Sequence, residues 1–341
     1  MRRNVVVIGA SSGGIDALRF IAGLLPADFP AAIAVVQHMG PASPGILHTI
    51  LAMAGPLDAV CVQTSEPLRP RTIFVPRPNH HLVVEPSRLR STLGPRENRF
   101  RPAIDPLFRS AAQAHGPRVV GVILTGGLDD GAAGLWAVKQ LGGVAVVQDP
   151  ADALVPSMPQ SAMAAVRVDH CVPLAGIPAL LVRLVSEDLA EKGGYSMPER
   201  IDIEVRIARE EPPIDVGVRK LGPPSPYACP ECHGVLLQVE EGEHIRFRCH
   251  TGHAYSIESL LAEFDDAADR AVWNSLRALQ EEAMFLRHLM AHARERKDER
   301  LMEALEKRAR EAEDRLAKVR SAAMKAKQAG TAPPIVSLGD E

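Results

Sequence analysis

Apolar and polar positions follow two different periods along the first 190 residues. Short, nearly all-apolar runs predict strands at residues 5–8, 31–36, 72–75, 82–84, 119–124 and 144–147. Elsewhere apolar residues recur three or four positions apart, which predicts helices near residues 15–24, 105–115, 131–141 and 176–190. Apolar strands separated by amphipathic helices predict a doubly wound, mainly parallel, Rossmann-like α/β sheet.

The pattern changes after Gly193-Gly194. Residues 193–226 carry six prolines among scattered charges, which indicates a linker, and residues 227–255 hold a compact group of cysteines and histidines. From 256 to 328, apolar residues alternate four and three positions apart among many charges, which predicts a coiled-coil-like segment. A break at residues 294–300 fits either a helical hairpin or one long bent helix. The end, 329–341, is predicted to be a disordered tail.

Composition narrows the class of protein. With 341 residues and 46% hydrophobic content, the chain is long enough for an α/β domain of residues 1–192 and the smaller parts that follow it. A formal net charge of -3 argues against nucleic acid as a partner. No run approaches the roughly 18 apolar residues of a membrane span, and the first apolar run is too short for a signal peptide. Five cysteines, an odd number, suit a reducing compartment, so we expect a cytoplasmic protein.

The first predicted strand runs into Gly9-Ala10-Ser11-Ser12-Gly13, which matches the pattern G-x-S-x-G. In that pattern a serine on a tight turn between a strand and a helix presents its hydroxyl outward. The following helix begins with free N–H groups that suit an oxyanion. A phosphate- or dinucleotide-binding turn explains the motif equally well, so the motif alone leaves both interpretations open.

Two further polar positions follow predicted strands. His38 comes just after the second strand, and Asp129-Asp130-Gly131 comes after the strand at 119–124. The carboxyl ends of parallel strands lie along one edge of a sheet, so a serine, a histidine and an aspartate are expected together there. Each alone has an ordinary explanation, a polar cap for the histidine and a turn or helix cap for the acidic pair.

A short-chain dehydrogenase is the main alternative enzyme. Such enzymes need a Tyr-x-x-x-Lys pair, but none of Tyr195, Tyr227 and Tyr255 has a lysine four positions on. The glycines of the first turn also fail to match G-x-G-x-x-G. The sequence therefore favours the hydrolase.

Residues 4–190 resemble the catalytic domain of CheB-type protein-glutamate methylesterases. The matching stretches, in order, are Ile8–Gly14 with its two serines, Gln37-His38-Met39, Arg101-Pro102-Ala103-Ile104-Asp105, Val122-Ile123-Leu124-Thr125-Gly126, Asp130-Gly131-Ala132-Ala133-Gly134, Gln148-Asp149-Pro150 and Ser157-Met158-Pro159. The resemblance implies that Ser11 is the nucleophile, His38 the base and Asp130 its orienting acid. Asp130 is preferred over Asp129 because the family's Asp-Gly step falls there.

Two departures concern the oxyanion hole, for which the resemblance implies the backbone N–H groups of Ser12 and Gly127. The family usually has threonine at Ser12, and Met-Gly where this chain has Gly127-Leu128. Gly127 still supplies an N–H, although less rigidly, so we expect the rate and not the reaction type to differ.

The resemblance implies demethylation of glutamate γ-methyl esters on methyl-accepting chemotaxis-type receptors, with release of methanol and no cofactor. It also implies deamidation of receptor glutamines. Arg99 and Arg101 are candidates to pair with acidic flanks of a receptor helix. The alternative is a non-catalytic adaptor on an esterase fold in a chemosensory-like pathway, which an intact triad disfavours. The family's usual receiver domain has no counterpart before Val5. We therefore expect regulation from the C-terminal parts or from a separate regulatory protein.

The cysteine and histidine segment has the spacing C-x2-C-x16-C-x3-H, formed by Cys229, Cys232, Cys249 and His253. This spacing predicts a small zinc-ribbon-like module with a structural zinc, built around a hairpin at Glu241-Gly242. His233 and His250 are competing ligands, and a metal-free fold stays open. The C-x-x-C-H haem motif at 229–233 would need an export route that the sequence does not indicate. We also expect that the helical tail either closes on itself or forms a homo-oligomer.

Overall fold

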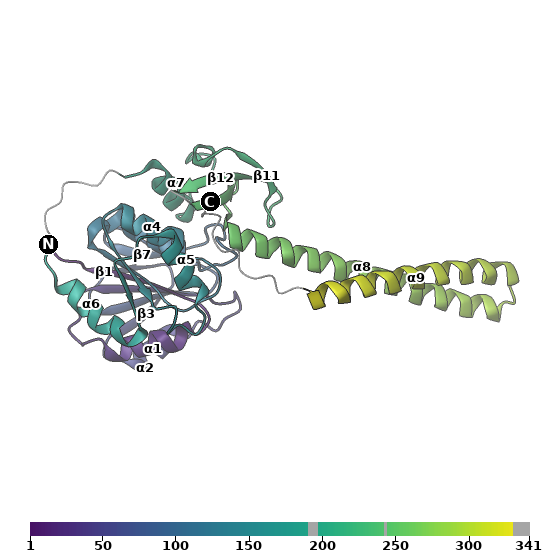
Figure 1. Cartoon of the computed structure of the whole chain (residues 1–341), viewed down its shortest axis with the longest axis horizontal. Helices are drawn as coiled ribbons and strands as arrows, with labels where there is room; N and C mark the ends of the chain where they lie inside the picture. Colours follow the sequence, from purple (N-terminus) through teal and green to yellow (C-terminus); the bar gives the residue numbers. More distant parts are fainter. Residues whose placement is uncertain (190–196, 242–243, 330–341) are drawn as a thin grey trace. The chain divides into compact units, whose positions relative to one another are not determined.

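The computed structural model describes residues 1–189, 197–241 and 244–329 (Figure 1). A seven-stranded sheet, parallel at every pairing, forms the centre of the first part of the chain. Its order is β10 (His170–Val172), β9 (Val144–Gln148), β8 (Val119–Ile123), β1 (Val5–Ala10), β2 (Ala32–Gln37), β5 (Thr72–Pro76) and β3 (Asp58–Val62). The predicted parallel α/β fold is confirmed.

Helices cover both faces of this sheet. One face packs against α1 (Gly14–Leu24), α2 (Leu47–Ala54) and α6 (Ile177–Ser186). The other packs against α3 (Ile104–His115), α4 (Ala132–Gln140) and α5 (Ser157–Ala165), and Figure 1 shows α1, α2 and α6 on the side away from α4 and α5. Strand β1 is apolar throughout because both of its faces are buried. Val5 and Val7 pack in the core on one side of the sheet, and Val6 and Ile8 pack in the core on the other side.

The apolar run at 82–84 forms a strand, but not one of the central sheet. Strand β6 (His81–Val84) pairs antiparallel with β7 (Arg88–Thr92), which pairs in turn with β4 (Ser65–Pro67). The expectation that this run extends the parallel sheet is therefore wrong. The physical reason is the short connection from β6 to β7, because only an antiparallel hairpin can be closed by so few residues.

Part of the expected linker at 193–226 is a packed helix. Helix α7 (Glu199–Ala208) buries Ile201 and Val205 in the core that contains α3, and Ile203 and Ile207 in a smaller cluster beside it. The linker interpretation is wrong for these residues. Pro198 precedes the first helical turn and Pro212 follows the last, so these prolines mark the ends of a helix rather than an extended segment.

The cysteine and histidine segment forms a four-stranded antiparallel sheet. Its order is β11 (Pro224–Ala228), β12 (Val235–Glu241), β13 (His244–Cys249) and β14 (Ala254–Ser256). The expected turn at Glu241-Gly242 lies partly outside the described residues. This sheet and the α/β domain belong to one compact unit, residues 1–260.

The described residues from 261 onward, up to 329, form a second compact unit. It contains most of α8 (Ile257–Glu295) and all of α9 (Glu299–Ala329), and the expected tail lies almost wholly outside the described residues. Ala283, Leu286 and Ala293 of α8 pack with Leu305 and Ala309 of α9. Ion pairs such as Arg287–Glu313 also join the two helices, so the break at 294–300 closes a hairpin rather than bending one helix. No described helix is long and apolar enough to cross a membrane.

Candidate active site

Ser11 lies on the turn between β1 and α1. Gly13 has a φ of 79°, a left-handed conformation that favours glycine. A Cβ on Gly14 would lie 2.6 Å from the Ala10 Cβ and 2.1 Å from the Gln37 side-chain oxygen, so close packing disfavours any side chain at this position. The Ser11 N–H donates to the Thr125 carbonyl at 3.0 Å, which ties the turn to the end of β8.

The three residues expected at one sheet edge do lie together. Ser11 Oγ is 3.1 Å from His38 Nδ1, and His38 Nε2 is 2.7 Å from Asp130 Oδ2. They follow β1, β2 and β8, which are neighbours in the sheet. A continuous chain of hydrogen bonds therefore leads from a serine hydroxyl, through an imidazole, to a carboxylate whose side chain is 1% exposed.

One further residue packs on the His38 ring, and another bonds to its backbone. Phe100 stacks on it with ring centroids 3.7 Å apart and an angle of 8° between the planes. The Gln37 side-chain amide donates to the carbonyls of Ser11 and His38, at 2.8 and 3.1 Å. No pattern in the sequence marks Phe100, because its contact depends on a loop that returns from residue 100 to the sheet edge.

Asp130 is fixed by four donors. Its Oδ2 accepts from His38 Nε2 and from the Ile104 N–H at 2.7 Å, and its Oδ1 accepts from Asn98 Nδ2 at 2.9 Å and the Asp105 N–H at 3.3 Å. Burial alone would raise the pKa of Asp130, but the bond and charge of His38 and the other donors outweigh it and lower the pKa. Asp130 is therefore the ionised partner of His38.

Asp129, the neighbour that the sequence left as a competitor, faces elsewhere. Its Oδ1 accepts from the Ser256 hydroxyl at 2.6 Å. Burial of the carboxyl raises the pKa of Asp129 to about 7, which the Ser256 hydrogen bond only partly offsets. The geometry places Asp130, not Asp129, against the imidazole.

The backbone around Ser12 and Gly127 suits an oxyanion. Among the described residues, neither N–H donates a hydrogen bond to a protein acceptor. The next amide, Gly126 N–H, is instead bonded to the Val155 carbonyl. Thr125 Oγ1 donates to the Ser12 carbonyl at 2.9 Å, so the two turns are tied together. Two free donors are thus held on neighbouring turns beside Ser11.

A cleft of about 470 Å³ opens over Ser11 and His38. Its lining includes Met39, Phe100 and three arginines, which are Arg96, Arg99 and Arg101. The Arg101 guanidinium donates to Asn79 Oδ1 and to the carbonyls of Leu93 and Gly94. Arg101 is therefore part of the cleft wall, whose charge is positive.

Comparison with known proteins agrees with this geometry. A family model described as CheB methylesterase matches residues 6–181, more than half of the chain. A relative from Leptospira interrogans, provisionally named a protein-glutamate methylesterase/protein-glutamine glutaminase, is 38% identical over 193 residues, covering 56% of this chain and 100% of the relative. The protein-glutamate methylesterase/protein-glutamine glutaminase 2 of Anaeromyxobacter dehalogenans is 40% identical, with 54% of each chain covered. The crystal structure of the Thermotoga maritima CheB methylesterase catalytic domain matches with a TM-score of 0.52 and 31% identity, covering 54% of this chain and 100% of that one.

The chain belongs to the CheB methylesterase family. The predicted resemblance is confirmed, and with it the prediction of a hydrolase. The chain spans about half the length of the Anaeromyxobacter relative and the whole length of the Leptospira relative. The family model ends at residue 181, so α7, the Cys/His sheet and the helical hairpin lie beyond it.

The remaining motifs of the CheB methylesterase family support the loops around Ser11. The Gln148 side chain accepts from the Thr125 N–H at 2.9 Å, and the Met158 N–H donates to the Gly126 carbonyl at 2.9 Å. These bonds set the path of residues 125–127. Gln148 and Met158 therefore support the loop beside Ser11, although both lie more than 130 positions after it in the sequence.

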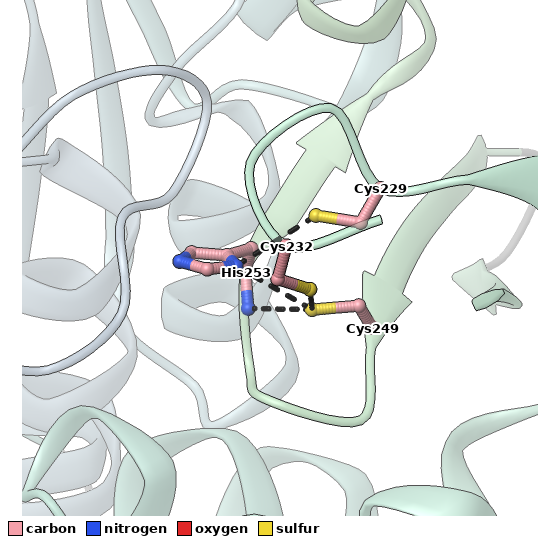
Figure 2. Close-up of side chains that lie close together, drawn as sticks. All are labelled: Cys229, Cys232, Cys249 and His253. Atoms are coloured by element: carbon pink, nitrogen blue, oxygen red, sulfur yellow. Dashed lines mark hydrogen bonds between the residues drawn. The ribbon is translucent and has the colours of Figure 1, made fainter. Parts of the chain in front are cut away.

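The four expected metal ligands also lie together. Cys229 and Cys232 follow β11, Cys249 ends β13 and His253 precedes β14, and their ligand atoms all lie within 4.8 Å of one another. Figure 2 shows the four side chains pointing toward a common centre. Within the described part of the chain, neither His233 nor His250 belongs to this group.

The distances within the cluster fit a tetrahedral ion. Three of them, Cys229 Sγ–His253 Nδ1, Cys249 Sγ–His253 Nδ1 and Cys232 Sγ–Cys249 Sγ, are 3.7, 3.6 and 3.6 Å. Ligands placed about 2.0–2.3 Å from one zinc ion are separated by roughly 3.4–3.8 Å. Glu231 Oε2 lies 3.2 Å from His253 Nε2 and would orient the imidazole so that Nδ1 faces the ion.

A buried group of charges connects the family domain to the Cys/His sheet. Arg248 Nη2 donates to Glu97 Oε1 at 2.8 Å and to Glu204 Oε1 at 2.9 Å. Arg109 pairs with Glu97 and lies 3.3 Å from Glu204, and Arg246 also contacts both glutamates. Burial would raise the pKa of Glu204, but Arg109, Arg246 and Arg248 together lower it to about 2.

Proposed function

We propose that this chain hydrolyses glutamate γ-methyl esters on methyl-accepting chemotaxis-type receptors, with Ser11 as nucleophile, His38 as base and Asp130 as orienting acid. One observation carries the proposal. Ser11 Oγ, the two nitrogens of His38 and Asp130 Oδ2 form an unbroken hydrogen-bonded chain, and Ser11 and His38 line the cleft. The names of the relatives from Leptospira and Anaeromyxobacter support the choice of substrate.

In the first half-reaction, Ser11 Oγ attacks the ester carbonyl while His38 Nδ1 takes its proton. Asp130 accepts from Nε2–H, so it keeps the neutral ring in the tautomer whose Nδ1 is free to accept. The N–H groups of Ser12 and Gly127 bind the oxyanion, each worth about 3 kcal/mol in comparable sites. The Nδ1 proton then passes to the departing methoxide, and methanol leaves.

In the second half-reaction, water attacks the acyl-serine. His38 Nδ1 takes a proton from this water and returns it to Ser11 Oγ, which releases the glutamate side chain. A glutamine side chain would follow the same course with ammonia as the leaving group. We therefore include deamidation in the proposal. Neither half-reaction needs a cofactor.

The cleft suits an acidic protein segment. Arg96 and Arg99 line it, and Arg101 adds positive charge from its wall. Receptor segments rich in glutamate would gain from this potential as they approach. We also expect that a separate regulatory protein could control this activity.

For the parts beyond the family domain of residues 1–192, we propose a zinc-ribbon-like module at 227–255 and a coiled-coil-like segment at 256–328. The donor set of three thiolates and one imidazole is typical of structural zinc, which when bound would stabilise the loops of the module. The tail closes on itself as a hairpin, and we propose that the exposed side chains of Met284 and Phe285 on α8 additionally join two copies of the chain.

The decisive experiment measures methanol release from methylated receptor. Ser11→Ala should abolish it, because it removes the hydroxyl that is hydrogen-bonded to His38 Nδ1 and attacks the ester. The matched control is Ser12→Ala, which removes an exposed hydroxyl but keeps the backbone N–H. Its kcat should stay within a few-fold of the wild type. Near wild-type release by Ser11→Ala would contradict the proposal.

A further inference from the structure

Asn98 stands between Asp130 and the C-terminal part of the unit. Its side chain is buried, and its Nδ2 donates to Asp130 Oδ1 and to Asp105 Oδ2, both at 2.9 Å. It therefore lies directly behind the carboxylate that orients His38. Asp130 is ionised and therefore only accepts hydrogen bonds, so the NH2 group of Asn98 must face it.

The other end of the same amide is held from outside the family domain. Asn98 Oδ1 accepts from the Ser256 N–H at 3.0 Å and from Ser259 Oγ at 3.3 Å. Ser256 ends β14 and Ser259 lies in the first turn of α8, and both are buried. All the donors and acceptors of the Asn98 side chain are thus used, which fixes the orientation of the amide.

Ser256 and Ser259 are themselves rigidly placed. Ser256 Oγ accepts from the Ser259 N–H at 3.0 Å, as an N-cap of α8, and donates to Asp129. The Asn98 N–H donates to the Ala254 carbonyl at 2.8 Å, and the Ala254 N–H donates to the Arg96 carbonyl. Strand β14 is thus hydrogen-bonded to the loop that carries Asn98.

We propose that Asn98 is a positioning residue for Asp130, and that Ser256 and Ser259 hold Asn98 in its working orientation. The segment from β14 into α8 is then a part of the esterase and not an appendage. The inference rests on the proposed triad of Ser11, His38 and Asp130. Without Asn98, Asp130 Oδ1 loses the shorter of its two hydrogen bonds, and the carboxylate can turn away from His38 Nε2.

The test uses the full chain and two readouts. The first is the rate at which a fluorophosphonate labels Ser11, where the hydroxyl oxygen bonds to phosphorus and fluoride leaves, so no receptor is needed. The second is kcat and KM for methylated receptor. Asn98→Ala should lower the labelling rate and kcat by on the order of 10- to 100-fold while KM is unchanged, because a small misplacement of a catalytic group has effects of that size.

The serines are tested through their dependence on Asn98. A Ser256→Ala, Ser259→Ala double variant should lower both rates by roughly 10-fold. Adding Asn98→Ala to it should give the rate of Asn98→Ala alone, because serines that act through Asn98 have nothing left to hold. Ser110→Ala is the matched control. Ser110 is a buried serine of α3 whose hydroxyl bonds Leu107 and Val84, so it should lower the Tm without changing either rate.

Three results are informative. The inference is supported if the serine double variant lowers both rates and the triple variant is no slower than Asn98→Ala alone. Serine variants with wild-type rates, or effects that multiply, overturn it while leaving the triad in place. A wild-type enzyme that fluorophosphonate does not label at Ser11 would overturn both the triad and the inference.

Discussion

His38 uses its two ring nitrogens in a defined order, with Nδ1 toward Ser11 and Nε2 toward Asp130. Chymotrypsin-type triads use them in the reverse order. The requirement is the same in both cases, because the nitrogen that faces the carboxylate must carry the proton. Stacking on Phe100 and the hydrogen bond that Nε2–H donates to Asp130 together leave His38 one productive orientation.

Asp130→Asn tests this requirement. An asparagine side chain that presents its NH2 to Nε2 favours the wrong tautomer of His38, so kcat for methanol release should fall by about 10⁴-fold. Asp129→Asn is the matched control on the adjacent residue, since Asp129 bonds Ser256 and not His38. It should stay within a few-fold of the wild type. Equal losses in both variants would contradict the choice of Asp130.

Asp129 also predicts a pH dependence of stability. The pKa of Asp129 is raised to about 7 by burial, and Glu258, Asp105 and Asp130 add to the rise. Between pH 4 and 7 the folded chain therefore binds a proton that the unfolded chain has released, so this residue makes stability fall as pH rises through that window. Asp129→Asn should make the Tm less dependent on pH between 4 and 7, as measured by calorimetry. A steeper dependence in the variant would contradict this.

The proposed triad could be recognised in the sequence because its members follow three apolar runs that form β1, β2 and β8. Strand ends and a known turn motif are local features, so Ser11, His38 and the pair Asp129-Asp130 could be predicted together, whereas the choice of Asp130 rested on the family resemblance. Phe100 and Asn98 could not, since their roles arise from a loop that returns to the site. Asn98 is fixed by residues more than 150 positions later in the chain.

At the scale of elements, continuous apolar runs predicted five of the seven strands of the central sheet, but not the edge strands β3 and β10, which are only partly buried. Which elements pair with one another was harder to predict. Strand β6 has the same composition as a central strand, and only its short connection to β7 makes it antiparallel. Helix α7 was not predicted, because the prolines near its two ends indicated a linker. Its apolar residues fall at every second position, Ile201, Ile203, Val205 and Ile207, and so serve two different cores.

The Cys/His sheet makes a prediction about metal. Purified protein should hold about one zinc per chain, because three thiolates and an imidazole at tetrahedral spacing form a closed structural site. Cys232→Ser should lower the zinc content and the Tm together, as measured by elemental analysis and calorimetry. Cys171→Ser, which changes an exposed cysteine outside the cluster, is the control and should leave the zinc content unchanged. Wild-type protein purified without zinc would contradict the proposed zinc site.

At the scale of the whole molecule, residues 1–260 form one unit although the family model ends at 181. The sequence suggested separate modules joined by a linker, because residues 193–226 carry six prolines among scattered charges. Arg109, Glu204 and Arg248 are instead almost fully buried, and they pair with one another across the parts. Burial of charge with its partner cannot be seen in a single sequence.

Glu204→Ala tests how strongly this group joins the unit. It leaves Arg109, Arg246 and Arg248 with only one nearby glutamate, and breaking a buried ion pair in this way costs about 3–5 kcal/mol in the free energy of unfolding. Glu199→Ala, on the same helix but in an exposed pair with Lys220, is the control and should have little effect. Urea denaturation of both variants gives the comparison. Equal stabilities would show that the buried group does not join the parts.

The buried charges also set a condition for protein engineering. Glu97 and Arg109 belong to the family domain, whereas Glu204, Arg246 and Arg248 lie beyond it. A chimera that grafts the C-terminal part onto another esterase must therefore transfer the five residues as a set. A graft made at a single fusion point would leave a cation or an anion unmatched inside the recipient, however well the two backbones were joined.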